Sequence, residues 1–220
     1  MSSKEVPFFH QLLFSRGHLS SGLSLVAIDF DKTYVNVHTL GRWSGSAESL
    51  AENVRPFFVS LIKQAVANKV VVAIVTSSMQ VALITKVLSL SLGPSLSKKV
   101  IVKGMDDTWS VPLYQALDST WQKVLQWRMK PTNNKKQGKI DHFISLAYTS
   151  FKSSSKPLRP QEVLYFDDDP VCVLAGRSNG FQAFQVRDNF NGLNTLNEYI
   201  ESGELPDVVS VSNSKACSIM

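Results

Sequence analysis

Short apolar runs alternate with helical patterns along most of the chain. Five of them have the length and composition of strands buried on both faces, at 23–29, 70–75, 100–102, 161–166 and 181–186. Apolar residues recur at helical spacing from Leu50 to Ala65 and predict one helix ending near Asn68, with further helices over 80–89 and 195–200. This alternation predicts an α/β fold, a Rossmann-like parallel sheet with helices on both faces.

About sixty residues separate the third strand from the fourth, more than one crossover requires. A helical stripe lies within them, formed by Leu113, Leu117, Trp121, Val124 and Leu125. Such a stripe could line a substrate site, but core packing is the favoured interpretation. We expect a small helical insert at about 90–134 and no large cap domain, because the stretch between Thr33 and Ser49 is too short for a folded lid.

Composition places the chain among ordinary globular proteins, with 44% hydrophobic and 19% charged residues in 220. We expect a single domain over 1–206, with the segment 92–97 as a loop and 207–220 as a flexible tail. No apolar stretch has the length of a transmembrane helix, the first residues carry no leader pattern, and two cysteines suit a reducing compartment. These features predict a cytoplasmic protein.

The formal net charge of +5 suits an anionic partner, such as a phosphate ester, a nucleic acid or an acidic membrane face. No basic and aromatic motif of a known nucleic-acid-binding module is present, so no nucleic acid is expected. His10, His18 and His38 lack the spacing of metal ligands.

Asp29 ends the first strand, and Asp31 follows two residues later. In an extended segment, a spacing of two points both side chains the same way, and two like charges held together raise one another's pKa. A bound divalent cation or a protonated carboxyl relieves that repulsion. The alternative is a turn rich in Asp that caps the next segment.

Three further polar groups are expected near the same edge of the sheet. Thr76 closes the second strand, Asp167 and Asp168 close the fourth, and Lys139 begins the helix that leads to the fourth. Ligands of parallel sheets bind beyond the carboxyl ends of the strands. Carboxylates suit a hard cation there, and a hydroxyl and an ammonium suit a phosphoryl group.

The ordered set Asp-x-Asp-x-Thr, Thr, Lys and Asp-Asp resembles the haloacid dehalogenase (HAD) superfamily of phosphohydrolases over about residues 23–190. A closer resemblance is to the eukaryotic magnesium-dependent phosphatase group. It depends on Val54–Pro56, Gly138–Phe143, Phe166–Asp169 and Arg187–Asp188. The polar segment 151–159 and the C-terminal tail depart from that pattern.

The resemblance implies a role for each matching residue. Asp29 would be the nucleophile that forms an aspartyl-phosphate, and Asp31 the general acid and then the base that activates water. Thr76 and Lys139 would hold the phosphoryl oxygens, while Thr33 would order the turn.

The resemblance also implies Mg²⁺ as the cofactor. Its ligands would be Asp29, the backbone carbonyl of Asp31, and Asp167, with Asp168 in support. Asp169 is expected to cap the helix that Pro170 begins.

These expectations describe a Mg²⁺-dependent phosphomonoesterase with an open site for a phosphorylated small molecule or protein. A phosphomutase or phosphotransferase of the same superfamily and a non-catalytic prenylated binding module are the alternatives. The chain ends in Cys217-Ser-Ile-Met220, which fits the farnesylation type of Cys-a-a-X. Lipidation at Cys217 would tether the protein weakly to the cytoplasmic face of a membrane.

Overall fold

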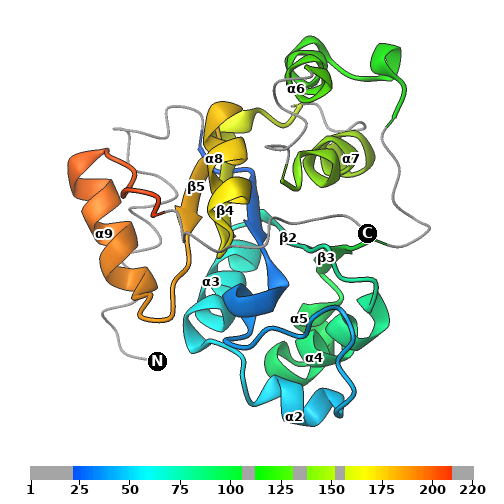
Figure 1. Ribbon diagram of the computed structural model, residues 1–220, viewed down its shortest axis with the longest axis vertical. Coiled ribbons are helices and arrows are strands. Elements are labelled where there is room, and N and C mark those ends of the chain that lie inside the picture. Colours follow the sequence, from blue (N-terminus) through cyan, green and yellow to red (C-terminus); the bar gives the residue numbers. More distant parts are fainter. Residues whose placement is uncertain (1–21, 106–111, 131–137, 152–156, 210–220) are drawn as a thin grey trace.

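A five-stranded, all-parallel sheet lies at the centre of the computed structural model, which describes residues 22–105, 112–130, 138–151 and 157–209 (Figure 1). The strands are β1 (Leu25–Ile28), β2 (Val71–Val75), β3 (Val100–Lys103), β4 (Val163–Asp167) and β5 (Gln182–Gln185). Their order in the sheet is β3-β2-β1-β4-β5, so β1 pairs with β2 on one side and β4 on the other. The predicted α/β, Rossmann-like fold class and all five strands are confirmed.

Helices cover both faces of this sheet. One face carries α2 (Ala47–Ala51), α3 (Pro56–Ala67), α4 (Val81–Leu92), α5 (Pro94–Ser97) and α9 (Gly192–Ser202). The other carries α6 (Ser119–Met129), α7 (Ile140–Phe151) and α8 (Pro170–Ser178), and Figure 1 shows α6 and α7 across the sheet from α3 and α4. Strand side chains alternate between the two cores: Val26 and Ile28 belong to the first, and Leu25 and Ala27 to the second.

The single helix expected from Leu50 to Asn68 is wrong, because the structure has α2 and α3 in its place. Pro56 is the reason. The residue before a proline is disfavoured in helical conformation, and Arg55 is extended, with φ −74° and ψ 121°. Val54 instead forms an isolated antiparallel bridge with Val35, and Pro56 occupies the first turn of α3.

Two further expectations about the helices need correction. The segment 92–97 is not a loop, because α4 continues to Leu92 and the short α5 follows at Pro94–Ser97. The last helix, α9, is longer than the expected 195–200, with Asn191 as its N-cap and Gly203 in the left-handed conformation at its end.

The stripe on α6 packs in the core, as favoured. Trp121 is 1% exposed and donates from its indole Nε1 to the Leu158 carbonyl oxygen at 2.7 Å, and Val124 and Leu125 are buried beside it. Leu113 does not belong to that buried stripe, because it precedes the helix and is exposed.

Cys217 and the rest of the segment 210–220 lie outside the described residues, so lipidation stays a prediction, and so does the division into one domain and a tail. Within the described part of the chain, no helix combines the length and the apolar character needed to cross a membrane.

Candidate functional site

Two buried carboxylates lie side by side at the carboxyl edge of the sheet. Asp29 follows β1 and Asp167 ends β4, and these strands are parallel neighbours with Ile28 opposite Phe166. The period-two alternation of the strands directs both side chains to the face covered by α7 and α8. Asp29 is 3% exposed and Asp167 is fully buried, so both charges need compensation from the protein.

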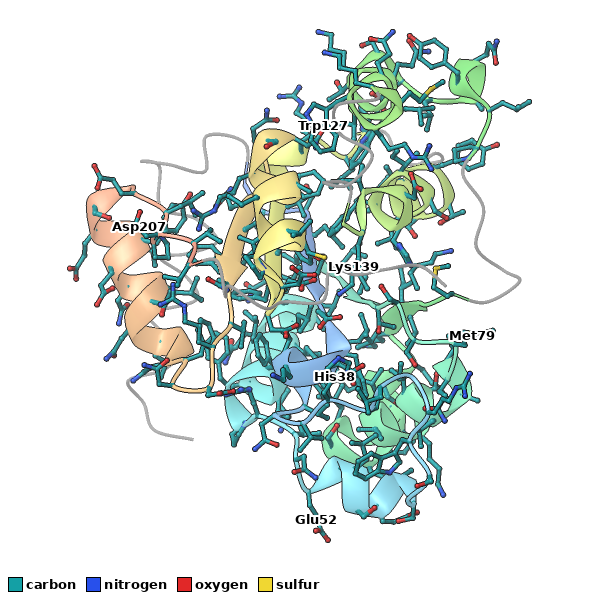
Figure 2. All side chains as sticks on the ribbon, in the orientation of Figure 1. His38, Glu52, Met79, Trp127, Lys139 and Asp207 are labelled. Atoms are coloured by element: carbon teal, nitrogen blue, oxygen red, sulfur yellow. The ribbon has the colours of Figure 1, made fainter. Side chains whose placement is uncertain are left out.

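Lys139 supplies that compensation. Its Nζ donates to Asp29 Oδ1 at 2.5 Å and to Asp167 Oδ2 at 2.8 Å. The side chain is 4% exposed, so the ammonium is held between the two carboxylates with little access to water. Figure 2 shows Lys139 near the middle of the molecule. The structure therefore brings into contact three predicted site residues that lie far apart in the sequence.

Gly138 fixes the path of the chain into Lys139. Its φ of +50° lies in the left-handed region, and an added Cβ would lie 2.8 Å from Cys172 Cα in α8. A side chain here would therefore push the start of α7 away from α8, and the lysine away from the two carboxylates.

We expect Gly138→Ala to lower the free energy of unfolding by more than the about 1–2 kcal/mol that a positive φ alone costs, because it also meets the Cys172 backbone. Chemical denaturation measures this. Gly41→Ala is the matched control, because Gly41 has φ +69° with open space around the added Cβ. Equal losses in the two variants would contradict the role of the close contact.

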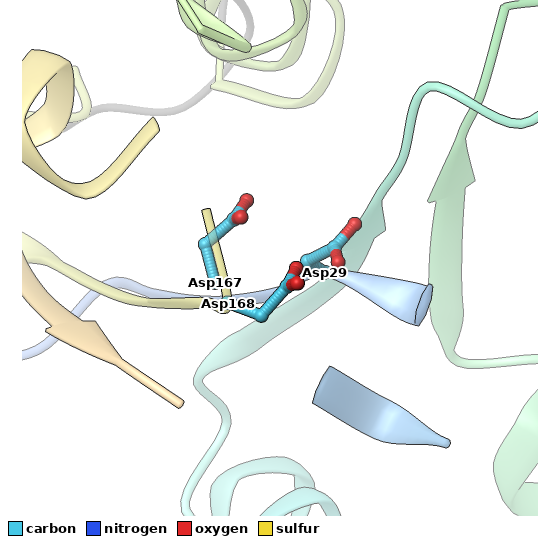
Figure 3. A group of neighbouring side chains, drawn as sticks. All are labelled: Asp29, Asp167 and Asp168. Carbon is cyan, nitrogen blue, oxygen red and sulfur yellow. The ribbon is translucent and has the colours of Figure 1, made fainter. Parts of the chain in front are cut away.

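Asp168 brings a third carboxylate to the pair. Asp29, Asp167 and Asp168 each offer an oxygen, and the three oxygens lie within 4.8 Å of one another (Figure 3). Asp167 is further held by the backbone N–H of Asp169, which donates to its Oδ1 at 2.9 Å. Three carboxylates around one ammonium leave an excess of negative charge in a buried place.

The pKa values reflect that excess. Burial raises the pKa of Asp29 well above its ordinary value, the nearby charges of Asp167 and Asp168 raise it further, and Lys139 opposes the rise. Burial, followed by the charge of Asp167, raises the pKa of Asp168 to about 7, while Lys139 and Lys32 lower it. Without added positive charge, the site therefore retains protons near neutral pH.

The donor set fits a hard divalent cation such as Mg²⁺. All three groups offer carboxylate oxygen, which Mg²⁺ prefers, and their oxygens are close enough to share one ion. A divalent charge would also balance the two negative charges that Lys139 leaves, and so favour the ionised carboxylates.

Asp31 keeps an extended backbone, with φ −68° and ψ 134°, but the segment around it is a tight turn and not a continuous strand. Residues Phe30–Tyr34 form the π-helical turn η1, in which Lys32 has φ +55°. The Asp31 carboxylate accepts from the backbone N–H of Thr39 at 2.9 Å and from the Thr39 hydroxyl at 3.1 Å. Both Asp31 oxygens are therefore held by Thr39.

His38 lies beside this carboxylate, a placement that its spacing in the sequence did not indicate. Its Nδ1 is 3.5 Å from Asp31 Oδ2 and accepts the backbone N–H of Leu40 at 3.0 Å. Because Nδ1 is an acceptor in this arrangement, the approach to Asp31 is a contact and not an ion pair.

The remaining predicted residues lie at or near the same edge. Thr76 is buried after β2, where its hydroxyl accepts from the backbone N–H of Ser78 at 3.1 Å. Thr33 is buried in η1, but its hydroxyl has no hydrogen-bond partner among the described residues, so its contribution to the turn is not a side-chain hydrogen bond. Asp169 caps α8 as expected, accepting from the Val171 N–H at 2.8 Å.

Tyr165 also belongs to the site, although it is not among the residues expected there. Its hydroxyl donates to Asp167 Oδ2, the oxygen that also accepts from Lys139. Burial and the charge of Asp167 raise its pKa well above the ordinary value, so the hydroxyl stays protonated. The available signal was its position two residues before Asp167 on a strand, which places both side chains on one face.

No protein-family model matches the chain, and no curated protein sequence matches it. A similar solved structure is the HAD domain of the effector protein Lem4 from Legionella pneumophila, determined as an inactive mutant. It is 13% identical with a TM-score of 0.43, and the match covers 81% of this chain and 91% of that one.

Proposed function

We propose that this protein is a HAD-type, Mg²⁺-dependent phosphomonoesterase that acts through an aspartyl-phosphate on Asp29. The observation that carries the proposal is the buried network in which Lys139 joins Asp29 to Asp167 beyond two adjacent parallel strands. The substrate is a phosphorylated small molecule or protein. The closer relationship to the magnesium-dependent phosphatase group belongs to the proposal, resting on the motifs alone.

In the first step, an Asp29 carboxylate oxygen attacks phosphorus, and the bond between phosphorus and the ester oxygen breaks. Asp31 donates a proton to the leaving alcohol. In the second step, Asp31 takes a proton from water, whose oxygen displaces Asp29 from phosphorus and releases inorganic phosphate. The hydrogen bonds from Thr39 support this role by fixing the position of the Asp31 carboxylate.

Positive charge is what this reaction needs most, because the transition state of phosphoryl transfer asks mainly for positioning and charge stabilisation. Lys139 supplies a fixed charge at the nucleophile, and Thr76 would donate a hydroxyl to the phosphoryl oxygens. A Mg²⁺ ion held by Asp29, Asp167, Asp168 and the backbone carbonyl of Asp31 would neutralise the carboxylates and the phosphoryl group.

We expect Mg²⁺ to stabilise the fold more at about pH 8 than at about pH 5. The pKa of Asp168 is raised to about 7, above the unfolded value, so without metal this group lowers the stability progressively as pH rises towards its folded pKa. At about pH 8 the Asp168 carboxylate is already ionised, so Mg²⁺ binds without displacing a proton from it. A Mg²⁺ concentration about 100 times the Kd would add about 2.7 kcal/mol to the free energy of unfolding. Thermal unfolding with and without Mg²⁺ measures this.

The activity test is hydrolysis of p-nitrophenyl phosphate with Mg²⁺, and again after EDTA. Activity that requires Mg²⁺ supports the proposal. Stabilisation by Mg²⁺ without hydrolysis of any phosphate ester would indicate the binding module instead. The assignment of Asp168 as a ligand would be contradicted if Mg²⁺ stabilised the wild type equally at the two pH values and stabilised Asp168→Asn by the same amount.

A further inference from the structure

The Asp167 carboxylate is held by three donors of the protein, and they are unevenly divided between its oxygens. Oδ2 accepts from Lys139 Nζ at 2.8 Å and from the Tyr165 hydroxyl. Oδ1 accepts from the backbone N–H of Asp169 at 2.9 Å. A carboxylate oxygen has two acceptor positions, so Oδ2 is saturated and Oδ1 retains one open position.

The packing around Tyr165 keeps its hydroxyl at Oδ2. Its ring stands edge-on against Phe143 of α7, with ring centroids 4.8 Å apart and planes at 75°. Gly176 of α8 also lets the backbone approach the ring closely, since an added Cβ would lie 3.2 Å from Tyr165 Cδ1. Tyr165 is 1% exposed, so water does not compete for the hydrogen bond.

We propose that Tyr165 is a positioning residue that restricts Asp167 to one metal-binding oxygen, Oδ1, and thereby sets the preference of the site for Mg²⁺ over Ca²⁺. The inference depends on the metal site of the proposed function and extends it to selectivity. Mg²⁺ takes an octahedral set of oxygens at short distance, which single carboxylate oxygens satisfy. Ca²⁺ accepts six to eight oxygens and readily takes both oxygens of a carboxylate.

Lys139 also donates to Oδ2, but its ammonium donates to Asp29 as well, so replacing it would change both carboxylates and the charge of the site. Tyr165 serves Asp167 alone through its hydroxyl, within the described residues. Removing that hydroxyl frees one acceptor position on Oδ2 and leaves the charge of the site unchanged. The second oxygen then becomes available to a larger ion.

Tyr165→Phe tests this, because phenylalanine keeps the ring contact with Phe143 and loses only the hydroxyl. Tyr199→Phe is the matched control: its buried hydroxyl bonds Gln182 Oε1 at 3.0 Å, at the far side of the sheet from Asp167 in the other core. The measurement is isothermal titration of the folded, metal-free protein with MgCl₂ and with CaCl₂, without any substrate.

We expect Tyr165→Phe to shift the ratio of the two dissociation constants towards Ca²⁺ by roughly tenfold, the scale on which partners of metal ligands act. Tyr199→Phe should leave the ratio at the wild-type value even if it lowers the melting temperature. A ratio in Tyr165→Phe equal to the wild type overturns the inference and leaves the metal site intact. A wild type that binds neither ion overturns the metal site itself.

Crystal structures of the wild type with each cation give the answer independently of whether Tyr165→Phe folds. With Tyr165 present, we expect Asp167 to contact either ion through Oδ1 alone. Coordination of Mg²⁺ through Oδ2, or through both oxygens, would contradict the role of the hydroxyl.

Discussion

Asp29→Asn is expected to reduce kcat for phosphate esters by about four to six orders of magnitude, the scale on which loss of a nucleophile acts. An amide does not form the aspartyl-phosphate, and the hydrogen bonds of the remaining groups give only residual catalysis. Steady-state hydrolysis of p-nitrophenyl phosphate with Mg²⁺ measures the effect.

The same variant should remain folded. Burial raises the pKa of Asp29 well above its ordinary value. At pH values above the unfolded pKa, the carboxyl group of Asp29 therefore lowers the free energy of unfolding, and a neutral amide of the same shape avoids this loss. We therefore expect Asp29→Asn to be at least as stable as the wild type at neutral pH, by chemical denaturation.

Asp118→Asn is the matched control for the chemical change. Asp118 caps α6 by accepting from the backbone N–H groups of Thr120 and Trp121, and asparagine caps as well as aspartate. This variant should keep both its stability and the proposed activity. A folded Asp29→Asn protein with the wild-type rate would exclude Asp29 as the nucleophile.

Lys139→Met should lower the free energy of unfolding by about 3–5 kcal/mol near neutral pH, since removing one partner of a buried ion pair leaves the other charge uncompensated. Two buried carboxylates, Asp29 and Asp167, would then face each other without the ammonium. The proposed phosphatase activity should be lost as well.

The pH dependence of this loss has a definite sign. Lys139 lowers the pKa of Asp29, so its removal raises that pKa further above the unfolded value. Between the unfolded and the folded pKa, Asp29 keeps its proton in the folded variant and has lost it in the unfolded chain. The free energy of unfolding of the variant therefore falls as pH rises. The deficit relative to wild type should therefore be larger at about pH 8 than at about pH 5.

The control for Lys139→Met is Lys86→Met, which breaks an exposed pair between Lys86 and Glu48. Such surface pairs contribute about 0–1 kcal/mol. If Lys139→Met cost no more than Lys86→Met at either pH, the ion pair of Lys139 would not hold the fold together.

The strands and the residues that end them could be predicted from the local sequence pattern. A short apolar run followed by Asp involves only a few neighbouring residues, so it does not depend on contacts with distant parts of the chain. Asp29, Thr76 and Asp167 lie after or at the ends of the strands expected for them. Lys139 lies immediately before α7, close to its expected place at the start of that helix. The sequence also contains the proline that breaks the helix, Pro56, but the apolar spacing on both sides of it favours one helix.

Side-chain direction beyond the strand end was not predictable in the same way. Asp31 turns towards Thr39 because Phe30–Tyr34 form a tight turn and the following loop returns to it. No local periodicity specifies that return, since it depends on long-range packing of the loop.

What the sequence determined by itself is the alternation of strands with helices along the chain, the positions of the acidic and hydroxyl residues at the ends of the strands, and that of the basic residue near the start of a helix. Only the tertiary structure decided that Lys139 lies between Asp29 and Asp167, that Thr39 donates to Asp31, and that Tyr165 shares the Asp167 carboxylate. The reason is physical: periodicity assigns a residue to a face, whereas contacts between faces depend on strand register and close approach, such as that of Gly138 to Cys172.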